Sequence, residues 1–129
     1  MNTLLLVEDD LETQDMMLSI LKKEYAVRCA TNSTEAWSAL EDRAVDLVLM
    51  DLSLRNNENG LVLARKILDR EEYRHIPIIA VTAHAFPTDR MKCINAGCTD
   101  YLPKPLRVSE LKAMISRHLQ VGVAVPAGA

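Results

Sequence analysis

Carboxylates close two apolar runs of this sequence, and they are the groups best placed to do chemistry. Glu8, Asp9 and Asp10 directly follow the first apolar run, and Asp51 directly follows a later one. If these runs form neighbouring parallel strands, about 4.8 Å apart, the acids meet at one sheet edge and repel one another. One acid alone would be a solvated loop start, but four together require a cation. Oxygen ligands without nearby His or Cys favour a hard ion such as Mg²⁺.

A hydroxyl and an ammonium group follow two further apolar runs. Thr82 comes after the fourth run and Lys104 after the fifth. Taken singly, a Thr at a strand end is usually a turn residue, and a Lys before Pro is a solvated loop charge. Together with the acids they offer what an aspartyl nucleophile needs to accept a phosphoryl group. Metal and Lys neutralise the phosphoryl oxygens while the hydroxyl bonds them. The Lys104–Pro105 bond can adopt the cis form at little cost.

The elements that must position these residues alternate along the chain. Short β-rich apolar runs predict five strands, at residues 3–7, 26–30, 45–50, 76–81 and 100–103. With helical segments between them they predict an α/β fold, a doubly wound (βα)5 sandwich of the flavodoxin-like kind. Right-handed crossovers leave few topologies, and the common one at this length is a parallel sheet in the order 2-1-3-4-5. Strands one and three are then neighbours, so the acids share a crevice.

Helical spacing marks the intervening segments. Two stripes are predicted to face the core, and their members are Leu11, Leu18, Leu21 and Leu61, Ala64, Leu68. Asn32, with Glu35 three residues later, predicts a capping box and a helix over about 33–41. A further helix over about 88–95 is stopped by Gly97. The last helix, over about 108–120, turns these residues inward: Leu111, Met114, Ile115 and Leu119.

Length and composition indicate one small domain. A chain of 129 residues predicts a domain at 1–120 and a short tail at 121–129 that frays. A net charge of -3 and a pI near 5.6 give no footprint for nucleic acid or anionic membrane. No signal peptide or membrane span is found, which predicts a cytoplasmic protein. The three cysteines show no CxxC spacing and are interpreted as buried structural thiols.

Four motifs together resemble the response-regulator receiver domain of two-component signalling, of the chemotaxis-regulator kind. They are Leu5-Leu6-Val7-Glu8-Asp9-Asp10, Leu47-Val48-Leu49-Met50-Asp51, Val81-Thr82-Ala83 and Tyr101-Leu102-Pro103-Lys104-Pro105. The resemblance runs from Leu4 to about Leu119, and it supports the same strand order. It implies that Asp51 accepts the phosphoryl group and that the metal ligands are Glu8, Asp9, Asp51 and the carbonyl of Ser53. It also implies that Lys104 contacts the phosphoryl group and that Thr82 and Tyr101 form a switch pair.

One stretch departs from the family pattern. Position 55 is Arg where a Pro is usual, and Gly60 comes one residue late. The polar loop 55–59 is therefore longer and predicted to be mobile, which bears on the metal geometry. Asp10 is interpreted as a bystander or helix cap. Ser53 and His84 correspond to positions that tune phosphoryl lifetime, although His84 is equally readable as an exposed loop histidine.

The resulting prediction is a phosphorelay response regulator rather than an enzyme. Asp51 accepts a phosphoryl group from a sensor histidine kinase or a histidine phosphotransfer protein, and the chain assists its own phosphorylation and dephosphorylation. With no output domain, a stand-alone regulator is expected, signalling through the face formed by residues 88–95, 100–103 and 108–120.

A haloacid-dehalogenase-type phosphatase is an alternative that fails because Ser53 stands where a second acid is needed. A flavodoxin fails because the acids after strand one repel phosphate. A receiver-like interaction module without phosphorylation stays open because of the altered loop.

Overall fold

Alternating strands and helices build the chain. The computed structural model describes residues 1–52, 54, 59–83 and 87–121, with 87–89 and 120–121 described by their backbone only. Its elements are β1 (Thr3–Val7), α1 (Leu11–Leu21), β2 (Ala26–Ala30), α2 (Ser33–Asp42), β3 (Leu47–Asp51), α3 (Gly60–Asp69), the short 3₁₀ helix η1 (Glu71–Tyr73), β4 (Ile78–Thr82), α4 (Pro87–Asn95), β5 (Asp100–Pro103) and α5 (Val108–Val121). The strands form one parallel sheet in the order β2-β1-β3-β4-β5, which confirms the predicted fold class and topology.

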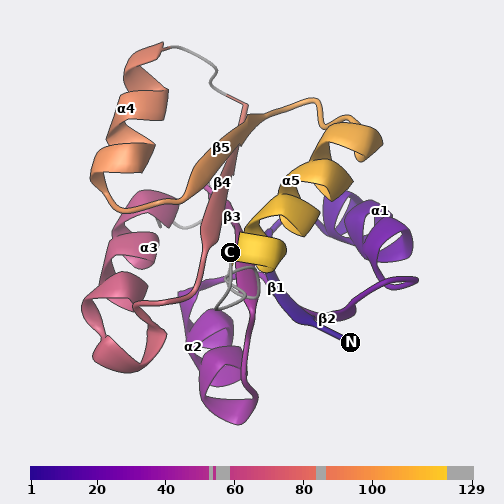
Figure 1. Ribbon diagram of the computed structural model, residues 1–129, viewed down its shortest axis with the longest axis horizontal. Coiled ribbons are helices and arrows are strands. Elements are labelled where there is room, and N and C mark those ends of the chain that lie inside the picture. Colours follow the sequence, from indigo (N-terminus) through magenta and orange to yellow (C-terminus); the bar gives the residue numbers. More distant parts are fainter. Residues whose placement is uncertain (53, 55–58, 84–86, 122–129) are drawn as a thin grey trace, which may run out of the picture.

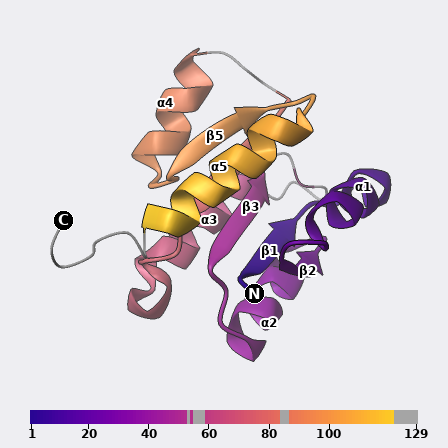
Figure 2. The same cartoon turned by 45° about the vertical axis from the view of Figure 1, so that its right-hand side comes forward.

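Helices cover the sheet on both sides. Helices α1 and α5 lie on one face, and α2, α3 and α4 lie on the other (Figure 1; Figure 2). Each face has its own apolar cluster, and alternate residues of β1, β3 and β4 point into one cluster or the other. All residues of these three strands are buried, as expected for the inner strands of a covered parallel sheet.

Two strands differ from their predicted ranges in a way that matters for chemistry. β3 and β4 each begin two residues later than predicted, and each includes its polar end residue, Asp51 or Thr82. The apolar residues Val45 and Ile76 are buried but precede the strands. Hydrophobicity indicates burial, whereas the bounds of a strand depend on backbone pairing. Strands predicted from apolar runs therefore began too early. The other three strands have the predicted bounds.

The predicted core stripes of two helices are confirmed in part, since Leu21 in α1 and Ala64 in α3 are fully buried. α1 buries Gln14, Met17 and Leu21, while Leu11 is 62% exposed. α3 buries Gly60, Leu63, Ala64 and Ile67, whereas Leu61 and Leu68 are only partly buried. The apolar pattern identified one fully buried member of each stripe but missed the buried Gln14 and Gly60 on the same two faces. In α5 the predicted face is confirmed, with Leu111 and Ile115 fully buried and Met114 and Leu119 packed beside them.

The predicted helix ends are confirmed, whereas the predicted burial of the cysteines is confirmed only in part. Asn32 caps α2 by accepting from the backbone N–H of Glu35, as predicted. Gly97 ends α4 with a φ of +102°, a conformation that a Cβ would strain. Cys93 and Cys98 are buried, but Cys29 is exposed, so the prediction of three buried thiols is wrong for Cys29. Cys29 lies on the edge strand β2, which has no neighbouring strand on its outer side. In the part of the chain that the structure describes, no helix is long and apolar enough to cross a membrane.

Candidate functional site

Three of the four carboxylates that were predicted to meet converge at the ends of β1 and β3, whereas the side chain of Asp10 caps α1. β1 and β3 are adjacent and pair Val7 with Met50, so the residues that follow, Glu8 and Asp51, lie side by side. Carboxylate oxygens of Glu8, Asp9 and Asp51 all lie within 4.8 Å of one another. Glu8 is 1% exposed and Asp51 4% exposed, while Asp9 is partly exposed. Two buried acids and one half-buried acid therefore share a single crevice at the carboxyl edge of the sheet.

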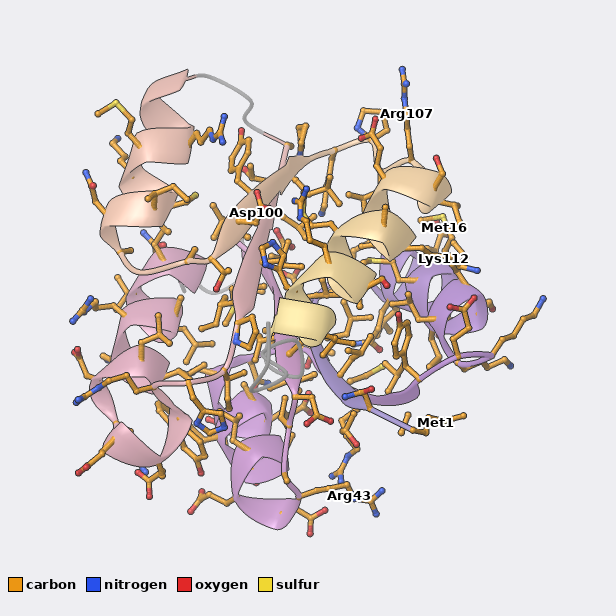
Figure 3. The ribbon with its side chains drawn as sticks, in the orientation of Figure 1. Met1, Met16, Arg43, Asp100, Arg107 and Lys112 are labelled. Atoms are coloured by element: carbon orange, nitrogen blue, oxygen red, sulfur yellow. The ribbon has the colours of Figure 1, made fainter. Side chains whose placement is uncertain are left out.

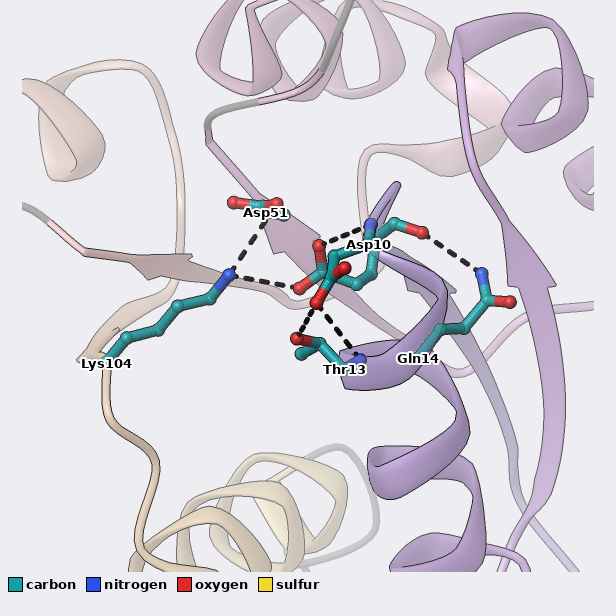
Figure 4. A network of polar contacts seen from close by, with 6 residues as sticks. Asp10, Thr13, Gln14, Asp51 and Lys104 are labelled. Carbon is teal, nitrogen blue, oxygen red and sulfur yellow. Dashed lines mark hydrogen bonds and ion pairs between the residues drawn. The ribbon is translucent and has the colours of Figure 1, made fainter.

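Lys104 reaches into this acidic cluster from β5. Its Nζ lies 3.1 Å from Oε1 of Glu8 and 3.7 Å from Oδ2 of Asp51 (Figure 4). Its backbone N–H donates to the carbonyl of Thr82, and the Lys104–Pro105 peptide is cis. Thr82 is the last residue of β4 and is 1% exposed. The structure thus brings the predicted acids, hydroxyl and ammonium to one sheet edge.

Burial and repulsion from Asp51 disfavour the charged form of the Glu8 carboxyl group. The pKa of Glu8 is raised to about 7, mainly by burial and also by the hydrogen bond and charge of Asp51, while the hydrogen bonds from Asp10 N–H and Lys104 act in the opposite direction. For Lys104, burial alone would lower the pKa, but the hydrogen bond to Glu8 and the charges of Asp51 and Glu8 raise it. Lys104 therefore stays cationic at neutral pH. One ammonium facing three acids leaves an excess of negative charge in the crevice.

This donor set suits a hard divalent cation. The converging ligands are carboxylate oxygens from Glu8, Asp9 and Asp51, with no thiolate or imidazole among them. Such oxygen-only sites favour Mg²⁺, which binds to one or two carboxylates and keeps several waters. A divalent ion would also offset the charge excess in the crevice. The predicted carbonyl ligand Ser53 lies outside the described residues, as do His84 and positions 55–58 of the altered loop.

The β1–α1 turn is anchored by hydrogen bonds that involve Asp10 and Gln14. The carboxylate of Asp10 accepts from the backbone N–H and the hydroxyl of Thr13, so Asp10 is the predicted helix cap. Asp10 N–H donates to Oε2 of Glu8 at 3.2 Å, and Nε2 of Gln14 donates to the Glu8 carbonyl at 3.1 Å. Sequence reasoning missed Gln14. A polar residue at helical spacing from the buried Met17 and Leu21 was the available signal.

Gly60 at the start of α3 is also needed near the site. A Cβ at this position would lie 2.3 Å from the backbone oxygen of Asp51 and 2.7 Å from the Cα of Leu52. The Gly60 N–H donates to the carbonyl of Leu52, and the side chain of Asn59 caps α3 through Leu61 N–H. The late glycine seen in the sequence therefore has a steric role. It lets α3 begin directly against the backbone of Asp51.

Thr82 and Tyr101 lie on the same face of the sheet. Tyr101 pairs with Ala80 and packs, half-buried, against the apolar cluster under α2, α3 and α4. Thr82 is two residues after Ala80, so it shares that face. Tyr101 is the second residue of β5, whereas Thr82 is the last residue of β4. Tyr101 lies on the strand next to that of Thr82, and the two residues are two positions apart along the strand direction.

The raised pKa of Glu8 predicts an unusual pH dependence for the metal-free protein. Folded Glu8 keeps its proton up to about pH 7, whereas unfolded Glu8 loses it near 4.5. Between these values the folded state binds more protons, so we expect the free energy of unfolding to fall as pH rises. Urea unfolding across this window in a chelator, with Glu8→Gln as reference, measures the effect. Parallel curves for the two proteins would contradict it.

Comparison with known proteins agrees with the fold and the site. The sequence matches the family described as response regulator receiver domain over residues 4–116. It is 35% identical over 111 residues to the two-component response regulator-like protein APRR3 of Arabidopsis thaliana, covering 84% of this chain and 22% of that protein. It is 34% identical to the transcriptional regulatory protein PmrA of Pectobacterium parmentieri, covering 87% of this chain and 50% of that protein. The chain thus spans half or less of the length of these relatives.

Solved structures show the same likeness. The receiver domain of sensor histidine kinase PA1611 from Pseudomonas aeruginosa PAO1, with magnesium coordinated in its active-site cleft, superposes with a TM-score of 0.82 at 34% identity. That match covers 92% of this chain and 97% of the other. A putative response regulator from Chloroflexus aurantiacus J-10-fl gives a TM-score of 0.85 at 28% identity, with the same coverage. With its sheet order, acidic crevice and matched residues, this chain belongs to the response regulator receiver domain family.

Phosphorylation on an Asp, Mg²⁺ in the acidic site, and exchange with histidine kinases or phosphotransfer proteins are general properties of this family.

Proposed function

We propose that this chain is a phosphoryl-accepting switch in which Asp51 is the acceptor. The observation that carries the proposal is the position of the Lys104 ammonium, which bridges the buried carboxylates of Glu8 and Asp51. A carboxylate that has a cation beside it and a hydroxyl group on the next strand can accept a phosphoryl group. The donor is a phosphohistidine of a sensor histidine kinase or of a histidine phosphotransfer protein.

The transfer needs positioning and charge neutralisation more than acid–base chemistry. A carboxylate oxygen of Asp51 forms the new P–O bond as the P–N bond of the donor breaks, and the imidazole keeps the electron pair and takes a proton from water. Lys104 neutralises the phosphoryl oxygens, and Thr82 bonds one of them through its hydroxyl. Glu8, Asp9 and Asp51 would hold Mg²⁺, which supplies further neutralisation of phosphoryl charge. Hydrolysis of the aspartyl phosphate resets the switch, so the chain assists its own turnover without being an enzyme for an external substrate.

The rim of the site suits a protein donor. A groove of about 510 Å³ opens beside Lys104 and is lined by Thr13, Met16, Ala83, Lys104, Pro105 and Leu106. Met16 is 50% exposed there, on α1. Because Asp51 is only 4% exposed, a donor histidine must approach it closely, and a donor protein that covers this rim would bring its histidine next to Lys104. A cytoplasmic location fits this role, since the three cysteines form no disulfide.

We further propose that the signal leaves through the face formed by α4, β5 and α5. The two helices that border this face carry exposed apolar side chains, Met91 and Ile94 on α4 and Val108 on α5. Asp100 ties β5 to α5, because its Oδ2 lies 2.7 Å from Nη2 of Arg117 and 2.8 Å from Nε2 of His118. Figure 3 shows Asp100 between the two elements. Tyr101 follows Asp100 directly, so a movement of its ring would act on both β5 and α5.

Thr82→Ala should separate phosphorylation from this output. A phosphoryl group bonded by the Thr82 hydroxyl draws that side chain toward Asp51 and frees space on the face that Tyr101 shares. We expect the variant still to accept a phosphoryl group, at a rate lower by about tenfold. NMR shift changes at Tyr101 and in α4 on phosphorylation should largely disappear. If those shifts persist unchanged in Thr82→Ala, the coupling does not run through Thr82.

A single experiment tests the proposed function against the interaction-module alternative. The intact mass of the protein is measured after incubation with a small phosphodonor such as acetyl phosphate, with Mg²⁺ and with a chelator. A Mg²⁺-dependent gain of one phosphoryl group supports the proposal. No gain under any condition, in a protein that is folded, would favour a module that binds partners without being phosphorylated.

A further inference from the structure

An amide side chain lies on the buried face of α1, where the other buried residues are Met17 and Leu21. Gln14 is 9% exposed, and its Nε2 donates to the backbone oxygen of Glu8 at 3.1 Å (Figure 4). Burying an amide is costly unless it is hydrogen-bonded, and an apolar side chain would fill the same position without that requirement. The amide is therefore matched to one acceptor, which belongs to the acidic site.

The acceptor oxygen lies in the peptide plane that joins Glu8 to Asp9. The atoms of a peptide unit are coplanar, so a hydrogen bond to this oxygen also fixes the direction in which the chain enters Asp9. The rest of Glu8 is held separately. Its N–H donates to the carbonyl of Ala30 at 2.9 Å, and its two carboxylate oxygens accept from Asp10 N–H and Lys104.

Repulsion within the site works against this arrangement. The carboxylates of Glu8, Asp9 and Asp51 lie within 4.8 Å of one another, and turning the Glu8–Asp9 peptide would move the half-buried Asp9 away from the others. Lys104 bonds the side chains of Glu8 and Asp51. The hydrogen bond from Gln14 is made to the Glu8–Asp9 peptide itself, so it opposes this rotation directly.

We propose that Gln14 is a positioning residue for the acidic site, which holds the Glu8–Asp9 peptide so that both carboxylates face one divalent cation. This inference rests on the proposed function only in taking Mg²⁺ as the ion. Gln14 touches neither the ion nor the phosphoryl group. Its contribution is to keep the ligands converged before the ion arrives, which favours binding by preorganisation.

The test compares Gln14→Met with Met17→Leu. Met has a similar length to Gln but lacks the N–H donor, and Met17→Leu perturbs the same buried face of α1 without a hydrogen bond to the site. The Mg²⁺ dissociation constant is measured by calorimetry at a temperature where each variant is folded. We expect it to rise about three- to tenfold in Gln14→Met, the equivalent of one lost hydrogen bond, and to stay at the wild-type value in Met17→Leu.

A metal-free readout accompanies the binding measurement. The carbon-13 shift of the Glu8 carbonyl should change in Gln14→Met and not in Met17→Leu, because only the former removes its donor. If Gln14→Met fails to fold, Gln14→Asn, which keeps a shorter amide, takes its place. A wild-type Mg²⁺ affinity in the folded Gln14 variant would overturn the inference and leave the proposed function intact. Absence of Mg²⁺ binding in the wild-type protein would instead overturn the metal site itself.

Discussion

Asp51→Asn should abolish the gain of a phosphoryl group on exposure to a phosphodonor and Mg²⁺. The amide that replaces the carboxylate is a poor nucleophile and carries no charge for the metal, while its size and buried position at the end of β3 are unchanged. Intact mass spectrometry measures the result. Asp42→Asn is the matched control, because Asp42 is an exposed acid on α2 that pairs with Arg28. We expect the control to be phosphorylated at the wild-type rate.

Although Asp51→Asn should abolish phosphorylation, it should increase the stability of the metal-free protein. Asp51 raises the pKa of Glu8 through a hydrogen bond and through its charge, so removing that charge lowers the pKa of Glu8. Above about pH 7, Asp51→Asn should therefore be more stable than the wild type in the absence of metal. The gain is roughly 1.4 kcal/mol for each unit by which the pKa of Glu8 falls. A variant that is phosphorylated at a comparable rate would contradict the assignment of Asp51, and one that is less stable than the wild type above pH 7 would contradict the stability prediction.

Much of the site could be predicted because its residues stand at chain positions that the fold fixes. Glu8, Asp51, Thr82 and Lys104 each stand at or next to the carboxyl end of a strand. In a parallel sheet all such ends meet at one edge, and the 2-1-3-4-5 order makes the acids neighbours. Apolar runs reveal the strands, and strand ends are recognisable to within a residue or two. Convergence of these side chains therefore follows from topology without any knowledge of side-chain geometry.

What the sequence did not reveal depends on contacts between elements. Gln14 acquires its role from one hydrogen bond to the chain end of β1, and a helical pattern alone shows only that a polar residue interrupts the apolar face. Gly60 is required because its backbone meets that of Asp51, a close approach that exists only in the folded chain. The position of Tyr101 depends on the register between β4 and β5, which the apolar pattern leaves open.

Lys104→Met should be the most damaging change after loss of the acceptor. Met keeps the apolar stem but removes the ammonium that faces Glu8 and Asp51. Loss of one preorganised charge at a site where phosphoryl charge must be neutralised typically costs about 10²- to 10³-fold in rate, so we expect a loss of about that size. The rate of mass gain with a small phosphodonor, at saturating Mg²⁺, measures it.

The metal-free protein should lose stability as well, by about 1–2 kcal/mol above pH 7, because two buried acids lose their counter-charge. The effect is kept below that of a fully buried pair because Lys104 is 27% exposed. It should shrink toward pH 4.5, where Glu8 is protonated in both folded proteins and has no charge to compensate.

Lys112→Met provides the matched control for both measurements. Nζ of Lys112 on α5 lies 3.1 Å from Oε1 of Glu24, and both side chains are more than a third exposed, at 35% and 52%. Surface pairs of this kind contribute about 0–1 kcal/mol, and Lys112 does not contact the acidic crevice. We expect its removal to leave the phosphorylation rate unchanged. If Lys104→Met and Lys112→Met were phosphorylated equally fast, the ammonium of Lys104 would be a structural counter-ion for Glu8 rather than a group that stabilises the transferred phosphoryl charge.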